Sequence, residues 1–187
     1  NTFFQSDTIH INSLVEGCRA GDRKAQEALY RAYYGAMVSL CLRYTKNDAD
    51  AVEVLNTGFL KVFQNIHRYN QKQAGLYAWI RTIIMNSCLD FIRQKKGALP
   101  SSDIEYAAEV HIPAEAVQKM GAEELLALVR ALAPATQAVF NLYVLEGYSH
   151  KEIAALLRIS EGTSKWHLAA ARKQLQQQLQ KKENLHG

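Results

Sequence analysis

The amino-acid sequence predicts an all-α protein in which two helical domains are joined by an acidic flexible linker and the second domain carries a C-terminal helix-turn-helix. Apolar residues recur three or four positions apart through most of the chain, and no alternating strand pattern stands out. Helix-breaking residues gather after Gly97, with Pro100 close behind. We therefore expect domains at residues 1–97 and 122–187, with the linker at 98–121.

The distribution of charge supports this division. Residues 1–97 carry 13 Lys and Arg against 8 Asp and Glu, and residues 125–187 carry 8 against 4. Residues 98–124 reverse the sign, with 1 against 6. Two basic helical modules thus flank an acidic connector. Basic modules suit a polyanionic partner such as nucleic acid, whereas an acidic connector does not.

In the first domain the periodicity predicts four helices, at residues 7–20, 22–44, 47–67 and 76–96. Asp22 is placed to cap the second helix, and Asn47 or Asp48 the third. A polar loop is expected at residues 68–75. The apolar stripes of the second and third helices are Leu29, Tyr33, Ala36, Met37 and Leu40, then Val52, Leu55, Phe59, Val62 and Phe63.

The second domain begins with a helix near Ala122, and Pro134 fits the first turn of another, which ends near Gly147. A short helix over residues 151–157, a turn and a longer helix capped by Ser160 then follow. The buried face of the long helix is predicted to be Ser164, Leu168, Ala171 and Leu175, and its opposite face Lys165, Trp166, Ala169, Ala170 and Lys173.

A short buried helix followed by an exposed basic one is the helix-turn-helix design, whose second helix enters a DNA major groove. An ordinary helical hairpin shows the same periodicity and remains the alternative. Arg158 stands where many such turns have glycine, and a residue with a Cβ is uncommon at positive φ. We therefore expect a strained turn or a different geometry there.

No catalytic or metal-binding pattern is present, so we expect neither an enzyme nor a cofactor. The sequence has no glycine-rich phosphate loop, no nucleophile elbow and no zinc-binding histidine pair. Cys18, Cys41 and Cys88 lie far apart and are expected to be buried reduced thiols. No stretch of 18 apolar residues and no signal peptide are seen, which indicates a cytoplasmic protein without stable membrane insertion.

Three segments resemble extracytoplasmic-function (ECF) RNA polymerase sigma factors. Residues 50–63 resemble the polymerase-binding segment of that family, and residues 79–93 its Trp-containing helix with the Asn, Asp and Arg positions. Residues 146–172 resemble its C-terminal module, including Glu152-Ile153-Ala154 and Gly162-Thr163. The three motifs occur in the family's order, and the resemblance extends over residues 20–180.

The resemblance implies a partner for each domain. The first domain would dock on the clamp helices of core RNA polymerase and open the −10 promoter element. The second would bind the −35 element and the polymerase flap. The acidic linker would thread a polymerase channel that is lined with basic groups. Family members are often held inactive by an anti-sigma factor, which is therefore an expected third partner.

The resemblance also implies the site residues. Polymerase binding is assigned to Glu53, Asn56, Phe59 and Lys61. The −10 contacts are assigned to Arg68, Tyr69, Asn70, Lys72, Asn86 and Arg93. The −35 contacts are assigned to Lys165, Trp166, Ala169, Ala170, Arg172 and Lys173. Val52, Asn56 and Thr57 stand where the family usually has acids and glutamine, which puts the strength of clamp binding in question.

Two other functions fit part of the sequence. An autonomous helix-turn-helix regulator would bind an operator as a dimer, but residues 174–180 are too short and too polar for a dimerisation heptad. A sigma-like protein-interaction module that has lost promoter use is compatible with the altered polymerase-binding segment. Co-migration with core polymerase separates these alternatives.

Overall fold

The computed structural model describes residues 2–95 and 121–186, with side chains described for 11–94 and 121–181. Every regular element in these ranges is helical, which confirms the predicted fold class. The predicted linker lies, apart from Gly121, outside the described residues. The chain forms two compact units, one of Asn1–Cys41 with Ala49–Ser87 and one of Leu42–Asp48 with Cys88–Gly187. The predicted domain boundaries stay a prediction.

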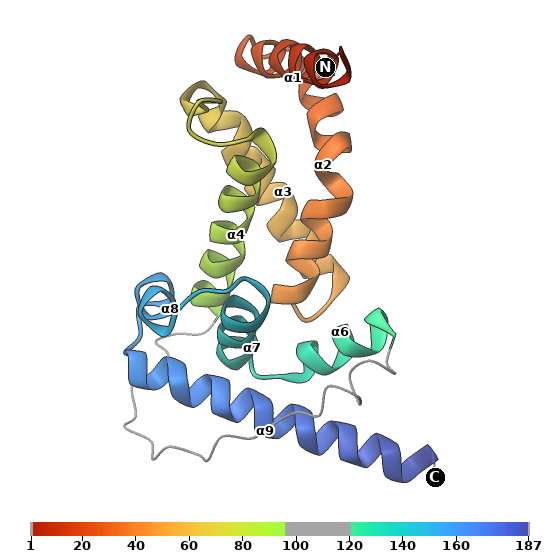
Figure 1. Cartoon of the computed structure of the whole chain (residues 1–187), viewed down its shortest axis with the longest axis vertical. Coiled ribbons are helices and arrows are strands. Elements are labelled where there is room, and N and C mark those ends of the chain that lie inside the picture. Colours follow the sequence, from red (N-terminus) through yellow and green to blue (C-terminus); the bar gives the residue numbers. More distant parts are fainter. Residues whose placement is uncertain (1, 96–120, 187) are drawn as a thin grey trace. The chain divides into compact units, whose positions relative to one another are not determined.

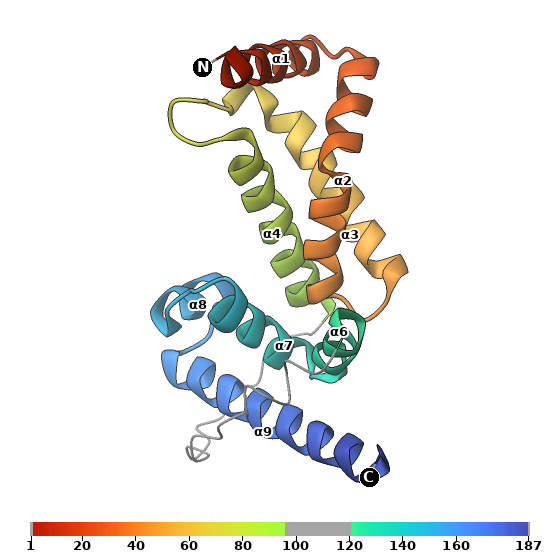
Figure 2. The ribbon, with the colours of Figure 1, turned by 45° about the vertical axis from the view of Figure 1, so that its right-hand side comes forward.

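The first unit is built from four helices and a short 3₁₀ turn. Their bounds are α1 (Thr2–Arg19), α2 (Arg23–Tyr44), α3 (Asp48–Asn65), η1 (Ile66–Arg68) and α4 (Leu76–Lys95), of which the ends of α2 and α4 belong to the second unit. The bodies of α2, α3 and α4 run side by side, and α1 crosses one end of them (Figures 1 and 2). Asp22 caps α2 as predicted, since its carboxylate accepts from the Lys24 N–H at 2.9 Å.

The core of this unit follows the predicted stripes with two corrections. Leu29, Met37 and Leu55 are fully buried, as the periodicity indicated. Ala36 and Val52, which were assigned to the stripes, are instead exposed. Each lies at the edge of its stripe, where a residue turns outward although its spacing still fits the period.

Gly58 allows α3 and α4 to cross closely. A Cβ at this position would lie 2.4 Å from Cδ1 and 3.4 Å from Cα of Ile84, which is itself fully buried. Ile84 therefore has little space into which it can shift, because protein interiors are packed at the density of organic crystals. Glycine at residue 58 is thus a packing requirement.

We predict that Gly58→Ala lowers the free energy of unfolding by about 1–3 kcal/mol through overpacking. Gly35→Ala is the matched control. Gly35 lies within helix α2 with nothing within 4 Å of its missing Cβ. Its replacement should raise stability by about 0.5–1 kcal/mol, because alanine loses less backbone entropy in a helix. Urea denaturation followed by circular dichroism measures both, and equal effects of the two substitutions would refute the packing argument.

The helices of the second unit resume at the predicted position. They are α6 (Ala122–Ala131), α7 (Pro134–Phe140), η2 (Asn141–Leu145), α8 (His150–Leu157) and α9 (Glu161–His186). Pro134 occupies the first turn of α7 as predicted, and the chain continues from α7 into the π-helical η2 without a break. Helix α9 packs against both α7 and α8 (Figure 1).

One apolar cluster joins α9 to α6. Leu128 and Leu132 come from α6 and its C-terminal end, and Ala171, Leu175 and Leu179 come from α9. Phe140 packs against the same cluster. The spacing of the three α9 residues is the predicted helical period carried one turn beyond Leu175.

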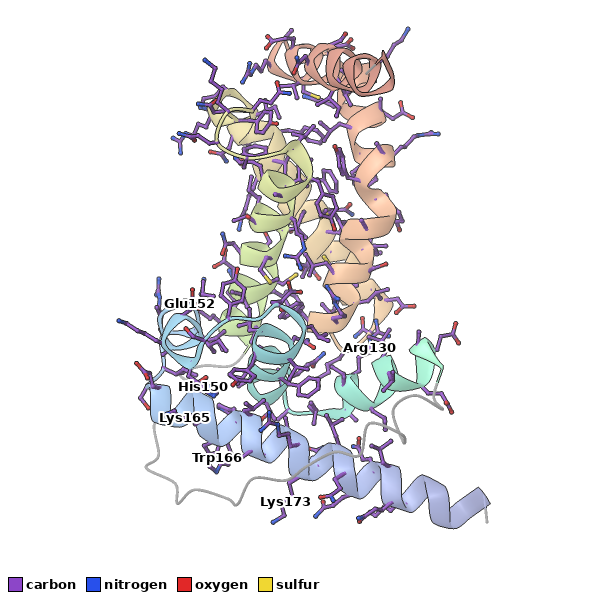
Figure 3. The ribbon with its side chains drawn as sticks, in the orientation of Figure 1. Arg130, His150, Glu152, Lys165, Trp166 and Lys173 are labelled. Atoms are coloured by element: carbon purple, nitrogen blue, oxygen red, sulfur yellow. The ribbon has the colours of Figure 1, made fainter. Side chains whose placement is uncertain are left out.

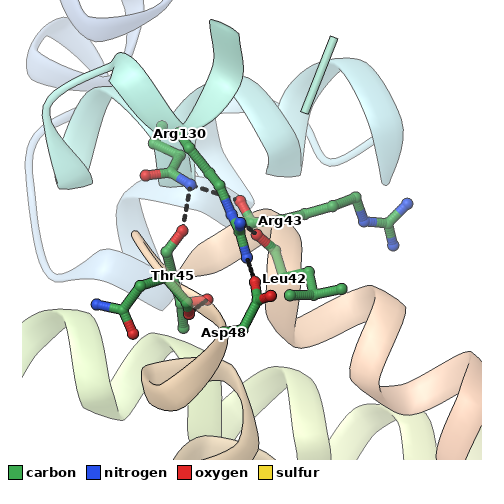
Figure 4. Close-up of polar contacts among 7 residues, drawn as sticks. Leu42, Arg43, Thr45, Asp48 and Arg130 are labelled. Carbon is green, nitrogen blue, oxygen red and sulfur yellow. Dashed lines mark hydrogen bonds and ion pairs between the residues drawn. The ribbon is translucent and has the colours of Figure 1, made fainter. Parts of the chain in front are cut away.

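Side chains of this unit also cap the carbonyl end of α2 (Figure 4). The Gln137 amide donates to the Arg43 carbonyl at 2.8 Å, and the Asn141 amide donates to the same oxygen. Arg130 donates from Nε to the Leu42 carbonyl at 3.1 Å and from Nη2 to Asp48 Oδ1 at 2.8 Å. The last carbonyls of a helix lack intrahelical partners, so these contacts explain why two amide side chains are completely buried on α7 and η2.

Candidate nucleic-acid and polymerase interface

A capping box begins α8. Ser149 Oγ accepts from the Glu152 N–H at 3.3 Å, and Glu152 Oε2 accepts from the Ser149 N–H at 2.8 Å. The bonds from the Ser149 hydroxyl and N–H lower the pKa of the Glu152 carboxyl. This local signal fixes the start of the first helix of the helix-turn-helix at His150, one residue before the predicted start at Lys151.

Arg158 makes the turn in the left-handed conformation. Its φ is 56° and its ψ 50°, and its own N–H bonds to the Ala154 carbonyl. The next N–H, that of Ile159, bonds to the same oxygen at 3.0 Å. The predicted strain at this position is confirmed, because a Cβ in this region of φ costs roughly 1–2 kcal/mol.

The cap and rotation of α9 agree with the predictions. The Thr163 N–H donates to Ser160 Oγ at 3.0 Å, as a cap requires. The predicted inward residues Ser164, Leu168, Ala171 and Leu175 are all buried. Of the residues assigned to the −35 element, Lys165 and Lys173 are exposed and Trp166, Ala169, Ala170 and Arg172 are half-buried. Figure 3 shows Trp166 and Lys173 pointing away from α7.

Two histidines, which have no motif spacing in the sequence, join α9 to its neighbours. His167 is buried on α9, and its Nδ1 lies 2.9 Å from Thr136 Oγ1 of α7. His150 opens α8, and its Nδ1 lies 2.9 Å from Oγ of the buried Ser164. Both bonds depend on tertiary packing, so the sequence carries no signal of them beyond the predicted inward position of Ser164.

The polymerase-binding assignment on α3 needs one correction. Glu53 and Asn56 are exposed and Lys61 is half-buried, but Phe59 is only 2% exposed and its ring centroid lies 4.7 Å from that of Tyr30. The assignment of Phe59 to a partner surface is therefore wrong. It shares the inward face with the core residues of α3, where burial of an aromatic ring outweighs any surface role.

The exposed face of α3 contains apolar residues that the sequence reasoning missed. Val52 is 37% and Leu60 57% exposed, and they lie four residues to either side of Asn56. The Asn56 side-chain oxygen accepts from the Tyr30 hydroxyl at 2.9 Å. Val52, Asn56 and Leu60 therefore form one stripe on the outside of the helix. This stripe can be found in the sequence only once the inward face is known.

The loop assigned to the −10 element is exposed except for its aromatic residue. Arg68, Asn70 and Lys72 are exposed, whereas Tyr69 is 5% exposed, with its ring centroid 5.3 Å from that of Trp79. The Arg19 guanidinium also bonds to the Tyr69 carbonyl at 2.7 Å. The Tyr69 ring is thus part of the core of the fold. This corrects its assignment as a residue that stacks on a base.

The α4 residues assigned to the −10 element differ in their environment. Asn86 is exposed. Arg93 pairs with Asp90 on the preceding turn and donates from Nη1 to the Leu156 carbonyl at 2.7 Å. Its guanidinium is therefore already engaged at the C-terminal end of α8, where a cation is favourable.

The described residues contain no group of three or more side chains able to hold a metal ion. Cys18, Cys41 and Cys88 are buried thiols, as predicted. No described helix combines the length and apolar character that a membrane crossing requires.

Two family models match successive segments of the chain. The model of sigma-70 region 2 matches residues 29–97, and a model of sigma-70 region 4 matches residues 122–175. The ECF RNA polymerase sigma factor SigM of Mycobacterium tuberculosis is 30% identical over 159 residues, 83% of this chain and 78% of that protein. The ECF RNA polymerase sigma-E factor of Escherichia coli is 26% identical over 187 aligned positions, 94% of this chain and 97% of that protein.

A solved structure of CnrH in complex with the cytosolic domain of CnrY aligns with a TM-score of 0.47 and 17% sequence identity, over 89% of this chain and 95% of that one. That similarity is too low to support an inference. The family of the chain is shown instead by the sequence relatives and by the two family models, which together match most of the chain.

Two regions of sigma-70 type, in this order, define a transcription initiation factor. The chain belongs to the ECF family of RNA polymerase sigma factors. Its function is to initiate transcription by RNA polymerase at specific promoters. This family membership favours a sigma factor over an autonomous helix-turn-helix regulator and over a sigma-like protein-interaction module.

The left-handed turn provides a test of the helix-turn-helix geometry. Arg158→Gly should raise the free energy of unfolding by about 1 kcal/mol, because glycine adopts the left-handed conformation without a Cβ clash. Arg158→Ala removes the same charge but keeps the Cβ, so it should give no such gain. Urea denaturation of both variants decides the point, and equal stabilisation by alanine and glycine would show that charge, not backbone strain, is the cause.

Proposed function

We propose that each unit's exposed residues carry one step of initiation. The outward stripe of α3, with Glu53 and Lys61 beside it, binds the clamp helices of core polymerase. Arg68, Asn70, Lys72 and Asn86 contact the −10 non-template strand. The exposed face of α9 binds the −35 element. The observation that supports this most directly is the rotation of α9, whose buried residues leave Lys165 and Lys173 outside.

The remaining parts of the proposal follow from this role. Sigma factors are generally not catalytic, and we assign this chain a binding role alone, in the cytoplasm where polymerase and promoter DNA occur. Core polymerase and promoter DNA are its two partners, with the flap as the site for the second unit. An anti-sigma factor is a third proposed partner, as the ECF family relationship implies.

The −35 contacts are proposed to be of two kinds. Ala169 and Ala170 offer only methyl groups to thymine, so direct readout falls mainly to Lys165 and Trp166 near the start of α9. Arg172 and Lys173 lie two turns further on and are proposed to meet phosphates. Modest −35 specificity and a strong salt dependence are expected from this composition.

Lys165→Ala and Lys173→Ala separate the two kinds of contact. Loss of a base contact should cost roughly 1–3 kcal/mol and relax the preference at one −35 position. Loss of a phosphate contact should weaken binding to every sequence and reduce the salt slope by about one. Transcription from a promoter library measures both. An unchanged −35 preference in Lys165→Ala would show that Lys165 does not contact a base.

The α3 surface is tested by placing charge on its stripe. The double variant Asn56→Arg with Leu60→Glu should reduce core-polymerase binding at least tenfold, because it introduces charges that a docked surface would have to desolvate. Gln73→Glu, on an exposed loop of the same unit, is the control and should bind core polymerase normally. Binding is measured by fluorescence polarisation after circular dichroism confirms folding. Normal binding by the folded double variant would show that core polymerase docks on another surface of the protein.

A further inference from the structure

His150 occupies a position beside the DNA-facing side of the helix-turn-helix that no part of the proposed −35 contact uses. It is the first residue of α8, and its ring is half-buried. One face of the ring stacks on Tyr143 of η2, with centroids 4.6 Å apart and planes inclined by 24°. The ring is therefore held in one orientation by an aromatic contact as well as by its hydrogen bond to α9.

The hydrogen bond determines which nitrogen remains for another partner. Nδ1 is 2.9 Å from Oγ of Ser164, which is completely buried and directly precedes Lys165. When the serine hydroxyl donates to Nδ1, the neutral ring carries its proton on Nε2. Nε2 is then a hydrogen-bond donor on a ring that is fixed relative to the recognition helix.

The charges around the ring are those of the proposed DNA surface. Lys165 and Arg172 act on His150 as repelling cations, and Glu161 as an attracting anion, and all three come from α9. Burial is the largest effect and, together with the two cations, it holds the pKa of His150 below the ordinary value of 6.5. The imidazole is therefore neutral near pH 7 in the free protein. Figure 3 shows His150 and Lys165 at the same end of the helix pair.

We propose that His150 contacts a backbone phosphate at the −35 element through Nε2 and takes up a proton at Nδ1 when the DNA binds, whereupon the Ser164 hydroxyl turns from donor to acceptor of the Nδ1 hydrogen bond. This inference rests on the proposed function, because it requires that α9 bind this element. A phosphate brought next to the ring offsets the repulsion by Lys165 and Arg172 and attracts the imidazolium. A charged imidazole also forms the stronger hydrogen bond to phosphate.

The sign of the pH effect follows from linkage. DNA raises the pKa of His150 above its value in the free protein, so the complex binds more protons than the separate components. Affinity then rises as pH falls through the pKa of the complex, and the gain levels off below the lower pKa of the free protein. One proton can change the dissociation constant by at most tenfold per pH unit, so we expect a two- to tenfold gain between about pH 8 and about pH 6.

The test uses the full chain bound to core polymerase and a promoter fragment with the −35 element, with affinity measured by fluorescence anisotropy at fixed ionic strength. His150→Gln should bind with little pH dependence, since an amide keeps a hydrogen-bond donor but does not titrate. His150→Lys is the second variant, and its permanent charge should make binding at high pH as tight as the wild type is at low pH. His67→Gln, an exposed histidine of the first unit, should keep the wild-type response.

The salt slope supplies an independent readout. At low pH the wild type should release about one more counterion than His150→Gln, because one more phosphate is neutralised. A residue that only positions Ser164 would change affinity without changing this slope. A pH response of His150→Gln equal to that of wild type, or a wild-type affinity that does not rise on acidification, would overturn the inference. If the holoenzyme ignores the −35 sequence at every pH, the proposed function itself fails.

Discussion

The apolar face of α9 determines what the second unit can present to DNA. Ala171, Leu175 and Leu179 pack with Leu128 and Leu132, and this contact fixes the rotation of α9 about its axis. Burying one leucine side chain stabilises by roughly 1.5–3 kcal/mol. An exposed ion pair contributes roughly 1 kcal/mol or less. The core therefore orients the helix, and the cations on its other face point outward as a consequence.

Hydrogen bonds add direction to that packing. Apolar contact alone tolerates small rotations and slips of a helix, because it is not directional. The bonds from His167 to Thr136 and from Ser164 to His150 tie α9 to two different neighbours. Buried Gln137 and Asn141 perform the same task for the carbonyl end of α2. Gln137, Asn141 and Ser164 are thus completely buried polar residues whose side chains are hydrogen-bonded.

The local signals in the sequence were sufficient for the elements and for the buried face of α9. Asp22, Pro134 and Ser160 occupy the helix starts at which they were expected, because capping depends on neighbouring residues only. Phe59 and Tyr69 could not be assigned in this way. An aromatic ring suits a core and a binding surface equally well, and only the partner ring, Tyr30 or Trp79, decides between them. The outward stripe with Leu60 became visible only after this decision.

The close crossing at Gly58 has a mechanical consequence for the proposed −10 contact. Gly58 lies in the α3 segment proposed to dock on polymerase, and the helix it touches carries Asn86 of the proposed −10 surface. Because α3 and α4 are packed closely at Gly58 and Ile84, the two helices behave as one rigid body, since a packed core deforms very little. A protein surface of this kind serves as a rigid template. Under the proposed −10 contact, the strands would be opened by displacement of the bases toward that template, while the two helices keep their positions.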